Sequence, residues 1–292
     1  MTDCFNFTEE QIERYARHII LPEIGGKGQS RLLSSHVLIV GMGGLGSPVA
    51  LYLTAAGVGH IGIVDSDQVD RTNLQRQVIH FTEDLGSGKL DSARRKMAAM
   101  NPEILVTPYP LRLNASNALD VLKDYDVIVD GTDNFPTRYL LNDACVFLKK
   151  PLVHAGVIRY EGQISVFKPG IGPCYRCIFP EPPPAGVIPS CREAGILGVI
   201  PGILGLLQAN EVLKLLLGIG QPLIGHLLLV DALHTEFRKV QIRRNSGCAI
   251  CGERPTITRL EDVVMETCEL EEGGICFGNS TFENGVPPTP HG

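Results

Sequence analysis

Short, mainly apolar runs recur along the first half of the chain and alternate with longer segments of mixed polarity. Runs of three to five residues predict buried strands at 36–40, 61–64, 104–108 and 127–129. The segments between and after them carry helical patterns, which predict helices ending at 56 and spanning 89–100, 117–123 and 138–148. Strands that alternate with helices in this way favour an α/β fold with a Rossmann-like, largely parallel sheet flanked by helices.

The pattern changes after Pro151. Strands separated mostly by turns are predicted at 152–153, 162–167, 227–230 and 236–242. One long apolar segment lies between Gly195 and Gly220, and residues such as Pro201 and Glu211 interrupt it. A membrane span needs about twenty nearly uninterrupted apolar residues, so we expect a buried core helix and no membrane association. The second half of the fold is therefore expected to be mixed or antiparallel.

Composition and charge limit the class of protein further. The 292 residues are 44 % hydrophobic, which is ample for one large core. The formal charge is −6, and residues 253–292 account for it, because they carry two Arg against eight Asp or Glu. No basic stripe is evident, which argues against a nucleic-acid-binding protein. The N-terminal residues lack a basic segment followed by an apolar one, so we expect no signal peptide and a cytoplasmic protein.

A glycine turn follows the first predicted strand directly. Gly41, Gly43 and Gly46 fit the GxGxxG spacing, and Gly44 lies within it. Such glycines permit a tight turn and let a phosphate approach bare backbone at the N-terminus of the next helix, which attracts negative charge. Asp65 follows at roughly the twenty-residue distance expected of a ribose-hydroxyl ligand. The stretch predicts a nucleotide site, and a tight strand–helix turn without a ligand is the alternative.

The residues after Asp65 help to distinguish between nucleotides, because a dinucleotide-binding dehydrogenase would show the same glycine pattern. Asp67 is a second acid in this segment. Arg76 can donate two parallel hydrogen bonds to phosphate oxygens, and Asn73 can bridge phosphate and ribose. An NAD enzyme needs only an adenine pocket here, so this polar segment suits a triphosphate that is being split.

Several segments resemble, in the same order, the MoeB/ThiF/HesA family, which comprises bacterial relatives of ubiquitin-activating enzymes. The matching motifs lie at 41–46, 56–59, 65–67, 73–77 and 131–134, and the resemblance covers roughly residues 8–258. It implies an adenylyltransferase that uses ATP and Mg²⁺ to activate the C-terminal glycine of a small ubiquitin-like sulfur carrier ending in Gly-Gly, of the MoaD or ThiS type. The product would be an acyl-adenylate, with release of pyrophosphate, for sulfur incorporation into molybdopterin, thiamine, a thiolated tRNA or cysteine.

The resemblance also implies roles for single residues. Arg17, on a helix predicted at 8–18, matches an arginine that reaches across a homodimer interface to the partner's ATP phosphates; a solvated polar helix face is the alternative. Lys89 matches a lysine that contacts these phosphates, and a plain surface lysine is the alternative. Asp133, followed by Asn134, matches the acid that positions Mg²⁺. For Asp133, an N-cap of the following helix is an alternative or an additional role.

The resemblance divides the predicted single domain, residues 1–258, into a nucleotide-binding half at about 1–150 and a carrier-binding half at about 151–258. Residues 259–292 lack periodicity and are expected to form a flexible acidic tail. Some relatives continue into a rhodanese domain that supplies sulfur, for which this sequence leaves no room. A separate sulfurtransferase or cysteine desulfurase is therefore an expected partner.

Four of the nine cysteines form two CxxC pairs, Cys174 with Cys177 and Cys248 with Cys251. In a chain without a secretory signal, such cysteines are more often ligands or reactive thiols than disulfides. Four thiolates suit a closed, tetrahedral and hence structural Zn²⁺ site, and members of the family often hold zinc through matching cysteines. A redox-active CxxC and metal-free core cysteines are the alternatives.

Cys191 lies between these pairs, in a proline-rich segment that is expected to be an exposed crossover. Arg192 and the N-terminus of the next helix would lower the pKa of its thiol. The matching cysteine takes part in covalent or sulfur-transfer chemistry in some relatives and is dispensable in others. A catalytic role and an incidental one both stay open.

Three other functions stay open as well. An NAD-dependent oxidoreductase is disfavoured by Asn73, Arg76 and the acid at Asp133. A catalytically silent partner subunit is disfavoured because the nucleotide-binding residues are intact. A member of the same family that adenylates another acceptor, such as a tRNA base or a peptide, would carry the same active site.

Overall fold

The computed structural model describes residues 7–184 and 194–263. The first half contains α1 (Glu9–Ile19), α2 (Gly25–Leu33), β1 (His36–Val40), α3 (Gly46–Ala56), β2 (His60–Val64), η1 (Arg71–Asn73), η2 (Thr82–Asp84), α4 (Lys89–Met100), β3 (Leu105–Tyr109), α5 (Ala118–Leu122), β4 (Val127–Asp130) and α6 (Phe135–Leu148). The second half contains β5 (Leu152–Ile158), β6 (Glu161–Phe167), α7 (Tyr175–Ile178), α9 (Val199–Leu217), β7 (His226–Asp231) and β8 (Glu236–Gln241).

One eight-stranded sheet joins the two halves, in the order β3-β2-β1-β4-β5-β6-β7-β8. The strands from β3 to β5 run parallel, and those from β5 to β8 pair antiparallel. The expected change of pattern after Pro151 is therefore confirmed, with β5 as the strand at which the sheet changes from parallel to antiparallel pairing. The predicted strand at 152–153 was too short, because β5 continues to Ile158 as the partner of β6.

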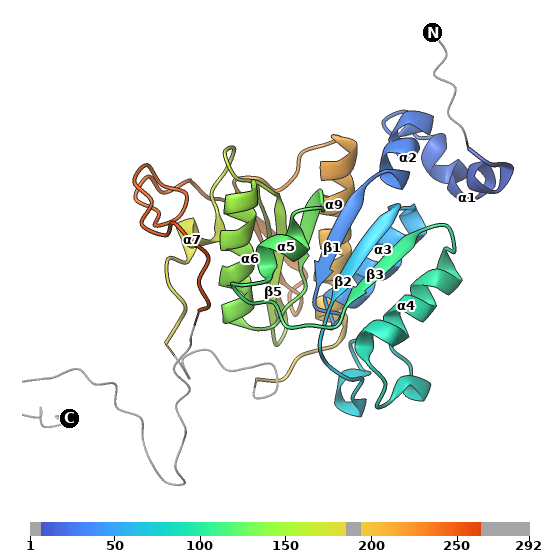
Figure 1. The fold of residues 1–292 in the computed structure, drawn as a ribbon, viewed down its shortest axis with the longest axis horizontal. Helices are drawn as coiled ribbons and strands as arrows, with labels where there is room; N and C mark the ends of the chain where they lie inside the picture. The colour runs from blue at the N-terminus through green and yellow to red at the C-terminus, as the bar shows by residue number, and fades with distance from the viewer. Residues whose placement is uncertain (1–6, 185–193, 264–292) are drawn as a thin grey trace, which may run out of the picture.

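Alternate residues of each central strand bury opposite faces of the sheet, as the twofold period of a strand requires. Val37 and Ile39 belong to a core shared with α3, α4 and α9, whereas Leu38 and Val40 belong to a core shared with α5 and α6. Helices thus cover both faces of the parallel part (Figure 1). This is the predicted α/β architecture, and it leaves the carboxyl ends of β1, β2 and β4 together at one edge of the sheet.

Helix α9 is the long apolar helix expected between Gly195 and Gly220. By length and composition alone it could cross a membrane, and half of the tested window is buried in the protein. It packs against α3, β5 and β6 in the core of one face. The core helices of many proteins are also long and apolar enough to cross a membrane, so α9 is only weak evidence for a membrane span.

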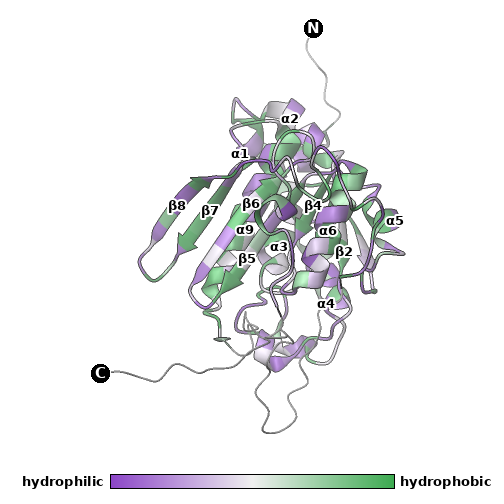
Figure 2. Ribbon diagram, turned by 90° about the vertical axis from the view of Figure 1, so that its left-hand side faces the viewer, coloured by the Kyte–Doolittle hydropathy of each residue, from purple (hydrophilic) through white to green (hydrophobic). Residues whose placement is uncertain are grey.

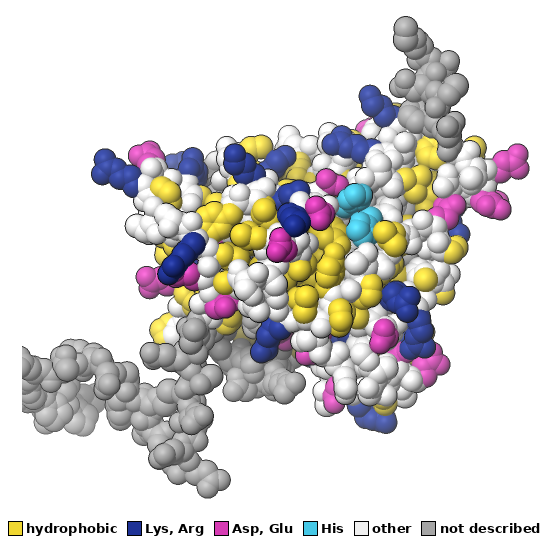
Figure 3. Space-filling model, viewed as in Figure 1, with side chains coloured by type: hydrophobic (Ala, Val, Ile, Leu, Met, Phe, Trp, Pro, Cys, Tyr) yellow, Lys and Arg dark blue, Asp and Glu magenta, His cyan; other side chains and the backbone are white. Residues whose placement is uncertain are grey.

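The antiparallel strands extend the sheet beyond the helices. Figure 2 shows β7 and β8 at its open edge, where β8 is largely hydrophilic. All six residues of β8 are exposed. On the face that carries α5 and α6, acidic and basic side chains are interspersed around apolar ones (Figure 3). That face therefore shows no continuous basic stripe of the kind that nucleic-acid-binding proteins carry.

Candidate functional site

The glycine turn and the first acid meet at the carboxyl ends of β1 and β2. Gly41 has φ of 93°, a conformation that favours glycine, and its N–H donates to the Val64 carbonyl over 2.8 Å. The Met42 N–H donates to Oδ2 of Asp65 over 2.8 Å, and the Asp67 N–H donates to its Oδ1 over the same distance. The carboxylate predicted to bind ribose therefore also fixes the turn that is predicted to bind phosphate.

Lys89 joins this group from the start of α4. Its Nζ lies 2.8 Å from Oδ2 of Asp67 and 3.9 Å from Oδ2 of Asp65. The side chain is 6 % exposed, so the alternative of a plain surface lysine is wrong. The side chain of Asp67, by contrast, is 67 % exposed and can change partner when a ligand brings negative charge to Lys89. Three residues predicted separately thus form one cluster of charges.

Arg76 lies beside the glycine turn and is bound to Asn73. Nη2 of Arg76 donates to Oδ1 of Asn73 over 2.9 Å. A Cβ built on Gly44 would lie 3.4 Å from Cγ of Arg76 and 3.1 Å from the ring of Pro201 in α9. Arg76 and Pro201 therefore both approach the turn at Gly44 from distant parts of the sequence, and the Arg76 side chain remains part-exposed.

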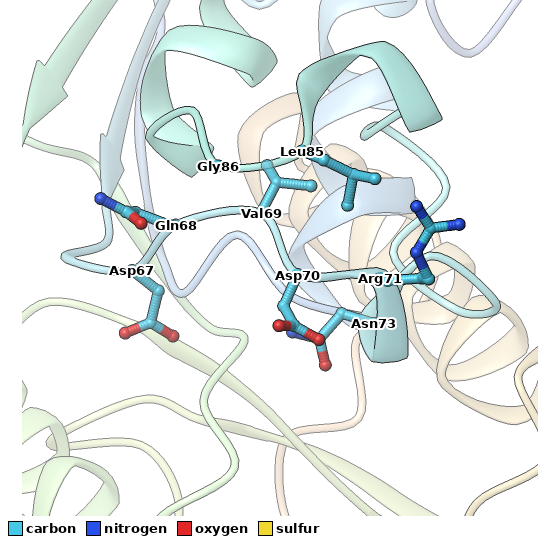
Figure 4. Close-up of a pocket in the computed structure, with 8 residues that line it drawn as sticks. All are labelled: Asp67, Gln68, Val69, Asp70, Arg71, Asn73, Leu85 and Gly86. Atoms are coloured by element: carbon cyan, nitrogen blue, oxygen red, sulfur yellow. The ribbon is translucent and has the colours of Figure 1, made fainter.

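A cavity of about 520 Å³ opens next to this cluster, lined by Asp67, Gln68, Val69, Asp70, Arg71, Asn73, Leu85 and Gly86. In Figure 4, the side chains of Asp67, Asp70 and Asn73 point to the same side, whereas that of Arg71 points away from them. Carboxylate and amide groups on one side of a cavity can bind hydroxyl groups or a hydrated cation. Asp67 and Asn73 belong to both the predicted site and this cavity.

Asp133 and Asn134 follow β4 at the same edge of the sheet, and both are exposed. Asn134 caps α6, because its Oδ1 accepts from the Thr137 N–H over 2.9 Å. The alternative in which Asp133 caps this helix is therefore wrong by one residue. Helix α6 begins at Phe135 rather than at the predicted 138, since the cap precedes a proline in its first turn. The Asp133 carboxylate is left free for another role.

The buried support of this loop was not among the predicted site residues. Asp130, at the end of β4, is fully buried, and its Oδ2 accepts from Nδ1 of His154 over 2.7 Å. Burial acts to raise the pKa of Asp130, but the hydrogen bonds from His154 and Thr132 lower it below its ordinary value. Burial also lowers the pKa of His154, so the pair is a carboxylate and a neutral imidazole. A histidine within an apolar strand was the only signal in the sequence.

Gln77 and His80 were also missed as site residues. The Nε2 of His80 lies 3.0 Å from the carbonyl oxygen of Met42 in the glycine turn. Oε1 of Gln77 is buried and has no hydrogen-bond partner among the described residues. Gln77 ends the motif at 73–77 and His80 lies three residues after it, which was the signal available in the sequence.

Arg17 lies apart from this cluster. It is exposed on α1, whose predicted capping box between Thr8 and Gln11 is present. The neighbouring Arg14 donates to the carbonyl oxygen of Met100, at the end of α4, over 3.1 Å. Lys89 begins α4, and at 1.5 Å per residue the helix is roughly 18 Å long. Figure 1 likewise shows α1 away from the loops that precede α4. The structure does not bring Arg17 to the glycine turn of its own chain.

The four predicted metal ligands do come together. Their sulfurs all lie within 4.8 Å of one another, with 3.3 Å between Cys177 and Cys251, 3.6 Å between Cys174 and Cys248, and 3.9 Å between Cys174 and Cys177. A tetrahedral zinc ion with Zn–S bonds of about 2.3 Å places its sulfurs about 3.8 Å apart. All four are free thiols, so the donor set fits Zn²⁺ closely. Cys191 lies outside the described residues.

Comparison with known proteins identifies the family. The sequence matches the ThiF family over residues 15–250. The chain belongs to the ThiF family. This membership confirms the resemblance inferred from the motifs.

Curated relatives from several domains of life are about half identical to this chain. A sulfur carrier protein adenylyltransferase of Thermus thermophilus is 52 % identical over 261 residues, which are 88 % of this chain and 96 % of that protein. The SAMP-activating enzyme E1 of Haloferax volcanii is 48 % identical over 89 % of this chain and 96 % of its own length. The adenylyltransferase and sulfurtransferase MOCS3 of Sus scrofa is 51 % identical over 87 % of this chain, which spans 56 % of that longer protein.

A solved structure supports the fold. The crystal structure of Escherichia coli MccB with ATP superposes with a TM-score of 0.72 and 25 % sequence identity, over 85 % of this chain and 75 % of that one. This ThiF-family protein and MccB therefore share a fold over most of their length.

Proposed function

We propose that this protein is an adenylyltransferase that uses ATP and Mg²⁺ to activate the C-terminal glycine of a small ubiquitin-like sulfur carrier ending in Gly-Gly. The observation that carries the proposal is the cluster at the sheet edge, where a bare glycine turn meets Asp65, Lys89 and Arg76. The 52 % identity to a sulfur carrier protein adenylyltransferase supports the same reaction and the same class of substrate.

In the proposed reaction, a carboxylate oxygen of the terminal glycine attacks the α-phosphorus of ATP. A bond forms between this oxygen and phosphorus, the bond to the bridging oxygen breaks, and pyrophosphate leaves with the electron pair. The protein has no covalent step to perform, so alignment and charge stabilisation account for catalysis. The glycine turn would hold phosphates, Asp65 the ribose, and Asn73, Arg76 and Lys89 the triphosphate.

Asp133 would organise Mg²⁺, together with Asn134 and the exposed Asp67. Hard carboxylate and amide oxygens are the ligands that this ion prefers, and Asp133 is exposed at the sheet edge beside the cluster. When bound, the ion would neutralise charge on the triphosphate. The residues themselves fix where the α-phosphorus stands relative to the incoming carboxylate.

We infer further that the active form is a cytoplasmic homodimer in which Arg17 of one protomer reaches the triphosphate held by the other. The distance of α1 from the turn of its own chain supports this arrangement. Cys174, Cys177, Cys248 and Cys251 would hold a structural Zn²⁺ with no open position. Residues 151–258 would bind the carrier, a sulfurtransferase or cysteine desulfurase would supply sulfur, and Cys191 would act, if at all, after adenylation.

ATP–pyrophosphate exchange with a panel of Gly-Gly-ended carriers tests the proposal. We expect exchange that depends on the carrier, that fails with a carrier lacking its last glycine, and that falls about 10²-fold or more in Asp133→Ala. Asp120→Ala, which removes an exposed carboxylate on α5 whose partner is Lys123, is the matched control and should keep full exchange.

Two results separate the alternatives. Exchange retained in Cys191→Ala would confine this cysteine to a later step, and loss of exchange in that variant would place it in adenylation. Absence of exchange with every carrier in the wild type would contradict the proposal. It would favour another acceptor, such as a peptide or a tRNA base, or a catalytically silent subunit.

A further inference from the structure

A buried pair of side chains lies directly behind the loop that carries Asp133. Asp130 and His154 are register partners on the neighbouring parallel strands β4 and β5, and both are at most 1 % exposed. Nδ1 of His154 donates to Oδ2 of Asp130 over 2.7 Å. The pair therefore occupies the last ladder position before the chain leaves the sheet toward the candidate site.

The other carboxylate oxygen of Asp130 holds the loop itself. Oδ1 accepts from the Thr132 backbone N–H over 3.0 Å and from its hydroxyl over 2.6 Å. Nη2 of Arg138 donates to the Thr132 carbonyl oxygen over 3.2 Å, and Nε2 of Gln208 donates to the Asp130 carbonyl oxygen over 2.8 Å. The turn from Asp130 to Thr132 is thus fixed at both ends, immediately before Asp133.

The position of His154 excludes direct contact with a substrate. Its ring is enclosed by aromatic rings, with centroids 4.9 Å from Tyr175 and 6.0 Å from Phe167. Its Nε2 is buried and has no hydrogen-bond partner among the described residues. A histidine that transferred protons to or from a ligand would need this nitrogen open to the site. Its one polar contact in the described structure is the carboxylate of Asp130.

We propose that His154 is a positioning residue, which orients the Asp130 carboxylate so that the Gly131–Thr132 turn presents Asp133 to the nucleotide. The inference rests on the proposed function, because it assumes that Asp133 acts at the triphosphate. Oδ1 of Asp130 can hold the loop only when the carboxylate is fixed at its other oxygen. His154 supplies the hydrogen bond that fixes this second oxygen, Oδ2. A residue that acts through a loop in this way is expected to change turnover and metal dependence more than folding.

The first pair of cysteines contributes to the same support. Tyr175 follows Cys174 directly, and its N–H donates to Oδ1 of Asn142 on α6 over 2.7 Å. Its ring packs edge-on against the imidazole of His154. The segment that carries the first two thiols thus closes the pocket in which His154 is held. Release of these thiols from a metal ion is expected to loosen the His154 ring.

Paired variants at position 154 test the proposal. His154→Asn keeps a donor near the place of Nδ1, whereas His154→Leu removes it and leaves Oδ2 of the buried Asp130 without its hydrogen bond. Val166→Ala, in the core on β6, is the matched control for lost packing, because Val166 is fully buried and makes no side-chain hydrogen bond. We would measure thermal stability, ATP–pyrophosphate exchange as a function of Mg²⁺, and hydrogen exchange of the loop amides.

We expect His154→Leu to lower the maximal exchange rate about tenfold to a hundredfold, since a small displacement of a catalytic group can cost this much. It should also raise the Mg²⁺ concentration needed for half-maximal rate and expose the Thr132 amide to hydrogen exchange. His154→Asn should restore most of the rate, and Val166→Ala should keep the wild-type Mg²⁺ dependence. If His154→Leu does not fold, Thr132→Val removes a donor to Asp130 from the loop side and should shift the same readouts.

Two outcomes would overturn the inference. One is wild-type Mg²⁺ dependence and wild-type protection of the amide at position 132 in the folded His154→Leu or Thr132→Val protein. The other is an equal loss of exchange in Val166→Ala at equal loss of thermal stability, which would reduce His154 to a core residue. Hydrogen exchange does not depend on turnover, so it separates the two proposals. If the wild type shows no adenylation activity but the Thr132 amide still loses protection in His154→Leu, the proposed function is contradicted and the positioning role of His154 is kept.

Discussion

Gly41 and Gly131 lie against each other at the carboxyl ends of β1 and β4. A Cβ built on Gly41 would come within 2.7 Å of the Gly131 carbonyl oxygen, and one built on Gly131 would come within 2.8 Å of the Gly41 carbonyl oxygen. The Gly131 N–H donates to the Val40 carbonyl oxygen over 2.8 Å. The turn predicted to bind phosphate and the loop predicted to bind Mg²⁺ are therefore in backbone contact, and neither can move alone.

The glycines of the turn are not equivalent, and Gly46 should be required for folding. A Cβ there would lie 1.9 Å from the Gly41 carbonyl oxygen, which is backbone and cannot move aside. Gly46→Ala is expected to lower the free energy of unfolding by about 3 kcal/mol, at the upper end of the usual cost of overpacking. Urea unfolding measures it, and unchanged stability would contradict the close approach.

Gly43→Ala is the matched control for Gly46→Ala, and we expect it to affect ATP binding rather than stability. The nearest atom to a Cβ at this position is Nε2 of Gln77, at 3.7 Å, which is an ordinary contact. The variant should fold with nearly wild-type stability. Its added methyl group would occupy the space where a phosphate approaches the backbone, so ATP binding measured by calorimetry should weaken at least about tenfold. Wild-type affinity would place the phosphates elsewhere.

The four-cysteine cluster predicts one zinc ion per chain, measurable by elemental analysis of the purified protein. Removal with a strong chelator should lower the thermal midpoint, because an ion bound by residues from two distant segments stabilises the folded state. Cys177→Ser should lose the metal, whereas Cys145→Ala, which alters a buried thiol outside the cluster, should keep it. Full metal content in Cys177→Ser would argue against this ligand set.

The alternation of apolar runs and helical patterns sufficed to predict the parallel part of the fold. Strands β1, β2 and β4 are almost wholly buried, so the apolar runs in the sequence agree with the place of these strands in the centre of the sheet. The glycine turn, Asp65 and the two CxxC pairs were accessible for the same reason. Their spacing in the sequence already reflects the geometry that brings them together.

The other features of the site depend on contacts between segments that are distant in the sequence, and no local pattern predicts such contacts. Asp130 and His154 become partners only through the register of β4 and β5. A plain surface lysine stayed an alternative for Lys89, because nothing near it in sequence predicts that Asp67 and Asp65 would lie beside its ammonium group. Tyr15 fixes α1 through Asn101, 86 residues away. Such pairings follow from topology and become readable only once the sheet order is known.

Asp84 provides a prediction about acid stability. Its carboxylate, in η2, is buried and pairs with Lys96 and, over 2.8 Å, with Arg95 on α4. Although burial acts to raise the pKa of Asp84, the hydrogen bonds from Lys96 and the Phe81 N–H lower it from 3.8 to about 2. The stabilisation is therefore complete above pH 3.8 and is lost as the pH falls toward 2.

Asp84→Asn should accordingly lower the free energy of unfolding by about 2 kcal/mol at neutral pH, and the difference from wild type should shrink as the pH falls below 4. Urea unfolding at a series of pH values measures this. Asp120→Asn, on an exposed ion pair with Lys123, should change stability by less than about 1 kcal/mol at any pH. A constant difference between Asp84→Asn and wild type down to pH 2 would contradict the assigned ion pair.

The reach of Arg17 can be decided by mixing inactive subunits. If Arg17 acts across a homodimer, Arg17→Ala and Asp133→Ala each inactivate every site in their own homodimers. In a mixed dimer, however, the nucleotide site of the Arg17→Ala chain keeps its own Asp133 and receives an intact Arg17 from its partner. Random exchange of subunits makes half of the dimers mixed, each with one complete site, so about a quarter of the wild-type exchange rate should return.

An arginine that acts within its own chain gives a different result, because both sites of a mixed dimer then lack one residue and no activity returns on mixing. Arg14→Ala, on the same helix but with its guanidinium bound to the Met100 carbonyl oxygen, controls for disturbance of α1. It should be active alone, and its mixture with Asp133→Ala should show the same activity as a mixture of wild type with Asp133→Ala. Recovery of about a quarter in the mixture would thus fix both the dimer and the direction in which Arg17 points.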